Sequence, residues 1–127
     1  MTLSKHLSIG ALGEEIACRY LKDRGFTIKD RNYRKKWGEI DIVSQKHGVT
    51  HFVEVKSCET GSSVDPAENL HEEKIKKLFR VFESYALERN TSLRDTSFEW
   101  QFDAAIVRIN TATKEARVKY FENLVAS

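Results

Sequence analysis

The stretch 38-GEIDIVSQKHGVTHFVEVKS-57 decides the fold, because it reads as two apolar strands joined by a tight turn. His47 and Gly48 stand at its centre, and glycine supplies one of the positive φ values that a two-residue hairpin turn needs. With the turn at this place, Val43 lies directly opposite Phe52. The stretch therefore predicts an antiparallel hairpin whose register is set by its turn.

The same register brings charged side chains together in the middle of the hairpin. Asp41 lies opposite Glu54, and Glu39 lies opposite Lys56, which shares a face with Glu54 because side chains alternate along a strand. Opposed residues have Cβ atoms about 5 Å apart, so two carboxylates there repel each other on a half-buried face. Lys56 offsets part of that repulsion. A divalent cation offsets more, since Mg²⁺ is typically held by one or two carboxylates, water and a substrate phosphate.

A further carboxylate is expected from the segment before the hairpin. Residues 10–24 have the apolar periodicity of a helix, and Gly25 follows as a stop signal. Glu14, Ala17 and Leu21 lie on one stripe of this helix. This stripe is expected to face the core of the protein. A charged residue placed like a core residue needs a partner, and the hairpin carboxylates are the candidates.

The alternative interpretation is an ordinary network of salt bridges. In that case Lys56 neutralises Glu39 or Glu54, and Asp41 lies at a solvated edge of the sheet. Each of these charges taken alone is typical of a solvated strand face. The set together favours a functional site, because two carboxylates that face each other repel unless a cation lies between them.

The rest of the chain adds a second helix and three more strands to the first helix and the hairpin. Strands are expected at 26–33, 38–44, 51–57, 98–109 and 115–121, and helices at 10–24 and from Asp65 to about Asn90. Asp65 is a good N-cap residue, and Pro66 suits the first helical position. The order α-β-β-β-α-β-β predicts a mixed α/β fold, with one sheet flanked by helices, in a single domain over residues 1–127.

Composition limits the compartment and the partners. The net charge of +2 supports no strong conclusion about an anionic partner, and the start of the chain has no apolar run of the secretory type. No stretch reaches the roughly 18 apolar residues of a membrane span, so no membrane partner is expected. Cys18 and Cys58 show no paired spacing, which predicts free thiols and a cytoplasmic protein. The four His residues lack the regular spacing of a zinc motif.

One segment is strongly basic. Residues 29–36 carry five Lys or Arg side chains against one Asp, and aromatic rings interleave with them. Basic and aromatic side chains together suit phosphate contacts and base stacking. The residues predicted to contact nucleic acid are Arg31, Tyr33, Arg34, Lys35, Lys36 and Trp37. The alternative is a solvated strand end.

The motifs as a set resemble one family. The pattern G-x-x-G-E-x-x-A-x-x-Y-L at 10–21, followed by R-N-Y-R at 31–34, G-E-I-D at 38–41 and F-V-E-V-K at 52–56, looks like the bacterial YraN-like family. That family is related to archaeal Holliday junction resolvases and to the PD-(D/E)xK nucleases. The resemblance covers nearly the whole chain and implies a restriction endonuclease-like core with a central mixed five-stranded sheet.

The resemblance also implies roles for individual residues. Asp41 matches the metal-binding Asp of the nuclease superfamily, and Glu54 matches its second acidic ligand. Lys56 matches the lysine of the E-x-K motif. Glu14 matches the Glu on the N-terminal helix of resolvase-like members. Two arginines that the family commonly has are missing. None follows E-V-K in 57-SCE-59, and Gln101 stands where R-F-D has its Arg.

Together these observations predict a metal-dependent endonuclease that hydrolyses phosphodiester bonds in DNA, with branched and damaged DNA as candidate substrates. Asp41, Glu54, the Val55 carbonyl and Glu14 would hold Mg²⁺ or Mn²⁺, and Lys56 would orient a water or stabilise the transition state. Glu39 and Lys74 are supporting candidates. A homodimer is a further expectation, because a single-site nuclease often dimerises to cut both strands. The alternatives are an inactive nucleic-acid-binding module of the same fold, and an interaction protein with a structural charge cluster.

Overall fold

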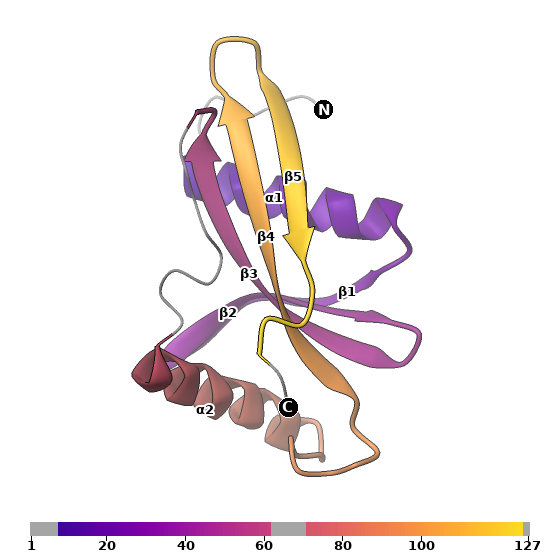
Figure 1. The fold of residues 1–127 in the computed structure, drawn as a ribbon. Helices are drawn as coiled ribbons and strands as arrows, with labels where there is room; N and C mark the ends of the chain where they lie inside the picture. The colour runs from indigo at the N-terminus through magenta and orange to yellow at the C-terminus, as the bar shows by residue number, and fades with distance from the viewer. Residues whose placement is uncertain (1–7, 62–70, 126–127) are drawn as a thin grey trace.

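The chain folds into one mixed sheet and two helices, in the order expected from the sequence (Figure 1). The computed structural model describes residues 8–61 and 71–125. Its elements are α1 (Ile9–Asp23), β1 (Thr27–Lys35), β2 (Gly38–Lys46), β3 (Val49–Glu59), α2 (Glu72–Glu88), β4 (Trp100–Asn110) and β5 (Glu115–Phe121). The sheet order is β1-β2-β3-β4-β5, in which β3 and β4 run parallel and the other neighbours antiparallel. The predicted mixed α/β fold is therefore confirmed.

The two helices cover opposite faces of the sheet, and each face has its own apolar core (Figure 1). Ile42 and Val53 pack with α1, whereas their chain neighbours Val43 and Phe52 pack with α2. Alternation of side chains along a strand explains this division. On the α2 side the ring of Phe52 stacks on that of Phe82, with 4.3 Å between their centroids.

The turn and the register of the hairpin are those predicted from the sequence. His47 and Gly48 have φ values of 51° and 78°, the pair of positive values that a type I′ turn requires. Val43 pairs with Phe52, as expected. Local turn chemistry thus set the alignment of the two strands.

The ladder between β2 and β3 ends sooner than expected. Its last pair is Ile42 with Val53, so Asp41 and Glu54 are not ladder partners, and the predicted pairing of Glu39 with Lys56 is wrong. The carboxylate of Asp41 instead accepts a hydrogen bond from the backbone N–H of Val55 at 2.8 Å. A side chain has replaced a strand–strand bond, and the two strands open around it.

A backbone irregularity lies at the same level on β1. Ile40 packs on the α2 side and Ile42 on the α1 side, although residues two apart on a regular strand share a face. Between the β1 partners of these two residues stands Asn32, with a φ of 52°, a value that Asn tolerates better than most residues. β1 and β2 therefore change faces together where Asp41 is located.

The second helix begins later than the sequence indicated. His71 has extended backbone and caps the helix, because its Nδ1 accepts a hydrogen bond from the backbone N–H of Lys74. The helix thus starts at Glu72 rather than at Pro66. Asp65 and Pro66, the expected cap and first residue, lie outside the described residues.

Two further expectations concern the cysteines and the membrane. Cys18 is buried and Cys58 is half-buried, and both are free thiols, as predicted. Among residues 8–61 and 71–125, neither helix has the length and apolar character needed to cross a membrane.

Candidate metal centre

Three of the carboxylates singled out in the sequence, those of Glu39, Asp41 and Glu54, line the opening between β2 and β3. Burial, together with the negative charges of Glu14, Glu39 and Glu54, raises the pKa of Asp41 to about 6, while the hydrogen bond from Val55 opposes the shift. Carboxylates from β2, β3 and α1 therefore act on one another electrostatically. Positive charge beside these carboxylates would stabilise their ionised forms.

The position of Glu14 depends on how closely α1 approaches β3. Gly13 lies against Ser57, so closely that a Cβ on Gly13 would be 1.7 Å from the Ser57 Oγ. The neighbouring Glu14 is half-buried as a result, and its Oε1 is buried without a hydrogen-bond partner among the described residues. Burial raises the pKa of Glu14, and Arg31 partly opposes the shift. An unsatisfied buried carboxylate oxygen is costly unless a donor or a metal ion meets it.

Glu54 is the point where two lysines converge. Its Oε1 lies 3.5 Å from the Nζ of Lys56 and 3.4 Å from the Nζ of Lys74, which stands in the first turn of α2. The sequence named Lys74 only as a supporting candidate. Two ammonium groups on one carboxylate oxygen offset the excess of negative charge in the cleft.

A hollow opens over these groups. A cavity of about 250 Å³ is lined by Asp41, Glu54, Val55 and Lys56, among others. A neighbouring cavity of about 360 Å³ shares Glu39 and Glu54 with it and extends towards Trp37, His71, Lys74 and Lys77. The acidic centre is thus reached from solvent past lysine side chains.

The supporting candidate Glu39 lies at the rim of the centre rather than opposite Lys56. Its carboxylate accepts a hydrogen bond from the Nε of Arg34 at 2.9 Å, and both side chains are exposed. Exposed pairs of this kind contribute little to stability. The charge of Glu39 nevertheless reaches Asp41 and Glu14.

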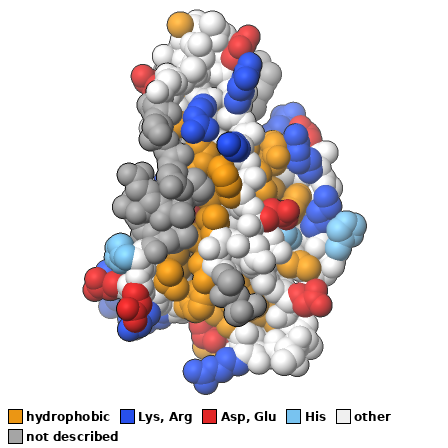
Figure 2. All heavy atoms as spheres, viewed as in Figure 1, with side chains coloured by type: hydrophobic (Ala, Val, Ile, Leu, Met, Phe, Trp, Pro, Cys, Tyr) orange, Lys and Arg blue, Asp and Glu red, His pale blue; other side chains and the backbone are white. Residues whose placement is uncertain are grey.

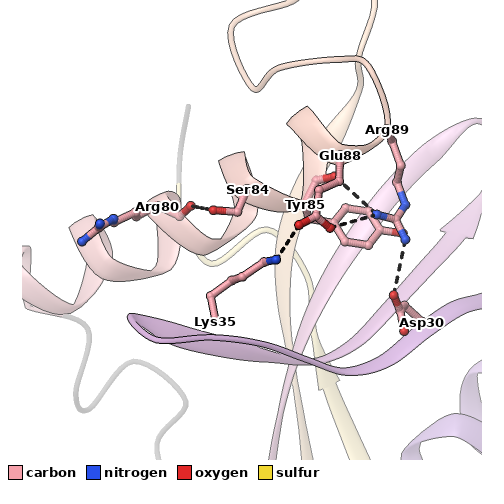
Figure 3. Close-up of polar contacts among 7 residues, drawn as sticks. All are labelled: Asp30, Lys35, Arg80, Ser84, Tyr85, Glu88 and Arg89. Atoms are coloured by element: carbon pink, nitrogen blue, oxygen red, sulfur yellow. Dashed lines mark hydrogen bonds and ion pairs between the residues drawn. The ribbon is translucent and has the colours of Figure 1, made fainter.

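The structure divides the basic segment instead of presenting it as one surface. Tyr33 and Trp37 are half-buried and pack against the α2 core, which leaves less of their rings available for stacking. Lys35 points towards α2, where its Nζ lies 2.5 Å from Glu88 (Figure 3). The aromatic residues and Lys35 therefore hold β1 under the helix.

Lys29, Arg31, Arg34 and Lys36 are the exposed basic members of the segment. Arg31 acts on Glu14, Arg34 pairs with Glu39, and Lys36 extends from the turn between β1 and β2. On the face drawn in Figure 2, the coloured basic side chains are spread over the upper strands, one side and the lower edge, without gathering into one patch.

A second polar cluster was not identified from the sequence as a site. Asp103, in the middle of β4, is fully buried and accepts hydrogen bonds from His51 at 2.6 Å and from Tyr120 at 2.5 Å. Gln101, which replaces the usual Arg of the family pattern, donates to Asp103 at 2.8 Å. The departure at Gln101 thus concerns this cluster and not the carboxylates around Asp41. The one signal in the sequence was an acid within the apolar stretch 102–107.

Comparisons with known proteins agree on one family. A family model described as "Uncharacterised protein family UPF0102" matches residues 13–107. A UPF0102 protein of Helicobacter pylori (strain HPAG1) is 39% identical over 105 residues, which cover 83% of this chain and 85% of the relative. One from Campylobacter lari is 40% identical over 92 residues, covering 72% and 80%. One from Alkaliphilus oremlandii is 34% identical over 115 residues, covering 91% and 95%.

Proposed function

The chain belongs to the UPF0102 family, and we propose that it is a metal-dependent endonuclease that hydrolyses phosphodiester bonds in DNA. The observation that carries the proposal is the group of carboxylates of Asp41, Glu54 and Glu14. Two lysines, Lys56 and Lys74, lie beside Glu54 in this group. Phosphodiester hydrolysis needs negative groups to hold a metal ion and positive groups to meet the phosphate, and this cleft has both.

The donor atoms fit a hard divalent cation. Asp41, Glu54 and Glu14 offer only oxygen atoms, and the buried Oε1 of Glu14 has an unfilled acceptor position. Oxygen donors favour Mg²⁺ or Mn²⁺ over softer metals. These three residues, with the Val55 carbonyl as a further donor, would hold the ion.

The residues of the chain have separable tasks in this reaction. When bound, the metal ion polarises a phosphate oxygen and lowers the pKa of its water ligand. Lys56 and Lys74 share a partner in Glu54, so an anionic substrate competes with that carboxylate for their ammonium groups. One lysine would then orient the attacking water while the other meets the phosphate. The exposed Arg34 and Lys36 would contact the DNA backbone outside the cleft.

A cleavage assay with a matched pair of carboxylate variants tests the proposal. Glu54→Gln removes the charge at the centre, whereas Glu59→Gln changes an exposed carboxylate near the end of the same strand. Linear, nicked, branched and damaged DNA are each incubated with Mg²⁺ or Mn²⁺. We expect cleavage by the unmodified protein and by Glu59→Gln, and at least about a hundredfold slower cleavage by Glu54→Gln, the loss typical of a residue that stabilises developing charge.

Two results would reject the proposed activity. The first is cleavage by Glu54→Gln at the normal rate, which would place the chemistry elsewhere. The second is salt-dependent binding of these DNA forms without turnover in either metal, which would favour the nucleic-acid-binding module. Lys56→Ala is included because it should lose turnover with metal binding retained.

Lys74 provides a prediction of its own. Lys74→Ala should slow cleavage about tenfold or more, because a positive charge near the phosphate is lost while the metal ligands remain. Lys76→Ala is the matched control, since Lys76 lies on the same helix, is largely exposed and pairs with Glu72 alone among the residues that the structure describes. Equal rates for the two variants in a steady-state assay would exclude Lys74 from the reaction.

A further inference from the structure

A second polar cluster lies away from the carboxylates of the cleft, where β3, β4 and the end of β5 meet. Its centre is the buried Asp103, whose Oδ2 accepts from His51 and Tyr120 and whose Oδ1 accepts from Gln101 and the backbone of Asn123. These four hydrogen bonds fill the acceptor positions of a carboxylate, so Asp103 serves as a support for its neighbours.

The neighbour that Asp103 supports is His51. An ionised carboxylate can only accept, so the Nδ1 of His51 carries the proton of this 2.6 Å bond and Nε2 is left with its lone pair. The side chain of His51 is only 7% exposed, and no described residue forms a hydrogen bond with its Nε2. A carboxylate behind a histidine, fixing which nitrogen is free, is the arrangement found behind metal-binding histidines.

A second donor is provided by the chain just beyond β5. Glu122 is exposed, and its carboxylate has an oxygen within 4.8 Å of a ring nitrogen of His51 and of an Asp103 oxygen. His51 and Glu122 both line a cavity of about 450 Å³, together with Tyr120. An ion can therefore reach both donors from solvent.

A cation is favoured by the donor atoms of this cluster rather than by the net charge of the cavity. The carboxylates of Asp103 and Glu122 each have an oxygen within 4.8 Å of a ring nitrogen of His51. Two basic residues also line the cavity, where Lys46 donates to the backbone carbonyl of Arg24 and the Arg24 guanidinium lies over the ring of Tyr20. An imidazole with a carboxylate suits Zn²⁺ better than Mg²⁺.

We propose that His51 and Glu122, supported by Asp103, form a second metal site that prefers Zn²⁺. The site is independent of the proposed nuclease centre, whose donors are all oxygen atoms. Zn²⁺ bound here would link β3 to the end of β5 and would keep open positions for water or an exogenous ligand. The sequence lacks the regular spacing of a zinc motif because His51 lies on β3 and Glu122 lies just beyond β5.

Calorimetric titration of the tag-free protein with Zn²⁺ tests this site. Asp41→Asn, which disables the first centre, should retain one Zn²⁺ per chain. Glu122→Gln should weaken this Zn²⁺ at least tenfold, whereas Glu115→Gln, an exposed carboxylate on β5, should leave the affinity unchanged. Because Glu122 is exposed, its substitution leaves the core intact.

Nitrogen NMR of the histidine rings gives a second readout. Zn²⁺ should shift the Nε2 resonance of His51 while the proton on Nδ1 stays in place. Unchanged Zn²⁺ affinity in Glu122→Gln would overturn the site, and so would loss of all Zn²⁺ binding in Asp41→Asn. Zn²⁺ binding that disappears only in Cys58→Ser would assign the ion to the thiol instead. Mg²⁺-dependent cleavage by Glu122→Gln at the normal rate would separate this result from the proposed nuclease activity.

Discussion

Asp41→Asn is expected to abolish Mn²⁺ binding and DNA cleavage while making the metal-free protein more stable at neutral pH. The pKa of Asp41 is about 6 in the folded protein against an ordinary value of 3.8, so the folded state binds this proton more tightly than the unfolded state. Stability is therefore lost as the pH rises through this window. The difference corresponds to about 3 kcal/mol at most, and solvent that reaches the cleft reduces it.

Urea unfolding in EDTA at several pH values between 4 and 7.5 measures this effect. The Asn variant and the unmodified protein should have similar stability near pH 4, and the variant should be more stable at pH 7.5. Mn²⁺ should then stabilise the unmodified protein only, because ligand binding to the folded state raises its stability. Asp30→Asn is the control, since Asp30 pairs with Arg89 outside the cleft. Equal destabilisation by Asp41→Asn at every pH would indicate a purely structural role.

Gly13→Ala is expected to destabilise the protein by about 3 kcal/mol, although alanine is the better helix former. The new Cβ would lie 1.7 Å from the Oγ and 2.8 Å from the Cβ of Ser57, so α1 must move away from β3. Glu14 moves with the helix, and metal affinity should fall as well. Urea unfolding and Mn²⁺ titration measure the two losses.

A double-mutant cycle identifies the contact responsible. Ser57→Gly removes both of the crowded atoms and leaves the Cα of residue 57 at 3.8 Å, an ordinary contact. Gly13→Ala combined with Ser57→Gly should therefore be more stable than the sum of the two single effects allows. Gly10→Ala, one turn earlier and open to solvent, should cost nothing. Strictly additive effects of the two substitutions would place the strain elsewhere.

Much of the fold follows from rules that act between neighbours in the sequence. The turn at His47 and Gly48 and the alternation around Val43 and Phe52 predicted the hairpin register correctly. The periodicity of residues 10–24 predicted α1 and placed Glu14 towards the sheet. These features depend on local backbone geometry, which a short stretch of sequence already contains.

The candidate site was only partly predictable. The hairpin register brought Asp41 and Glu54 to the same level, but the ladder ends before them, because the Asp41 carboxylate takes the N–H of Val55. The aromatic residues Tyr33 and Trp37 were predicted to contact nucleic acid, and nothing in the sequence indicated that both also pack partly against the α2 core. Whether a strand face is covered depends on a helix that arrives much later in the chain.

The sequence by itself thus determined the order of elements, the hairpin register and the acids that could share a cation. Only the tertiary structure decided which of those acids are buried, through the approach of Gly13 to Ser57, and brought Lys74 onto Glu54. It alone joined His51, Asp103 and Tyr120 from three strands. The physical reason is that burial and charge proximity arise from packing between segments distant in the chain, which local periodicity does not encode.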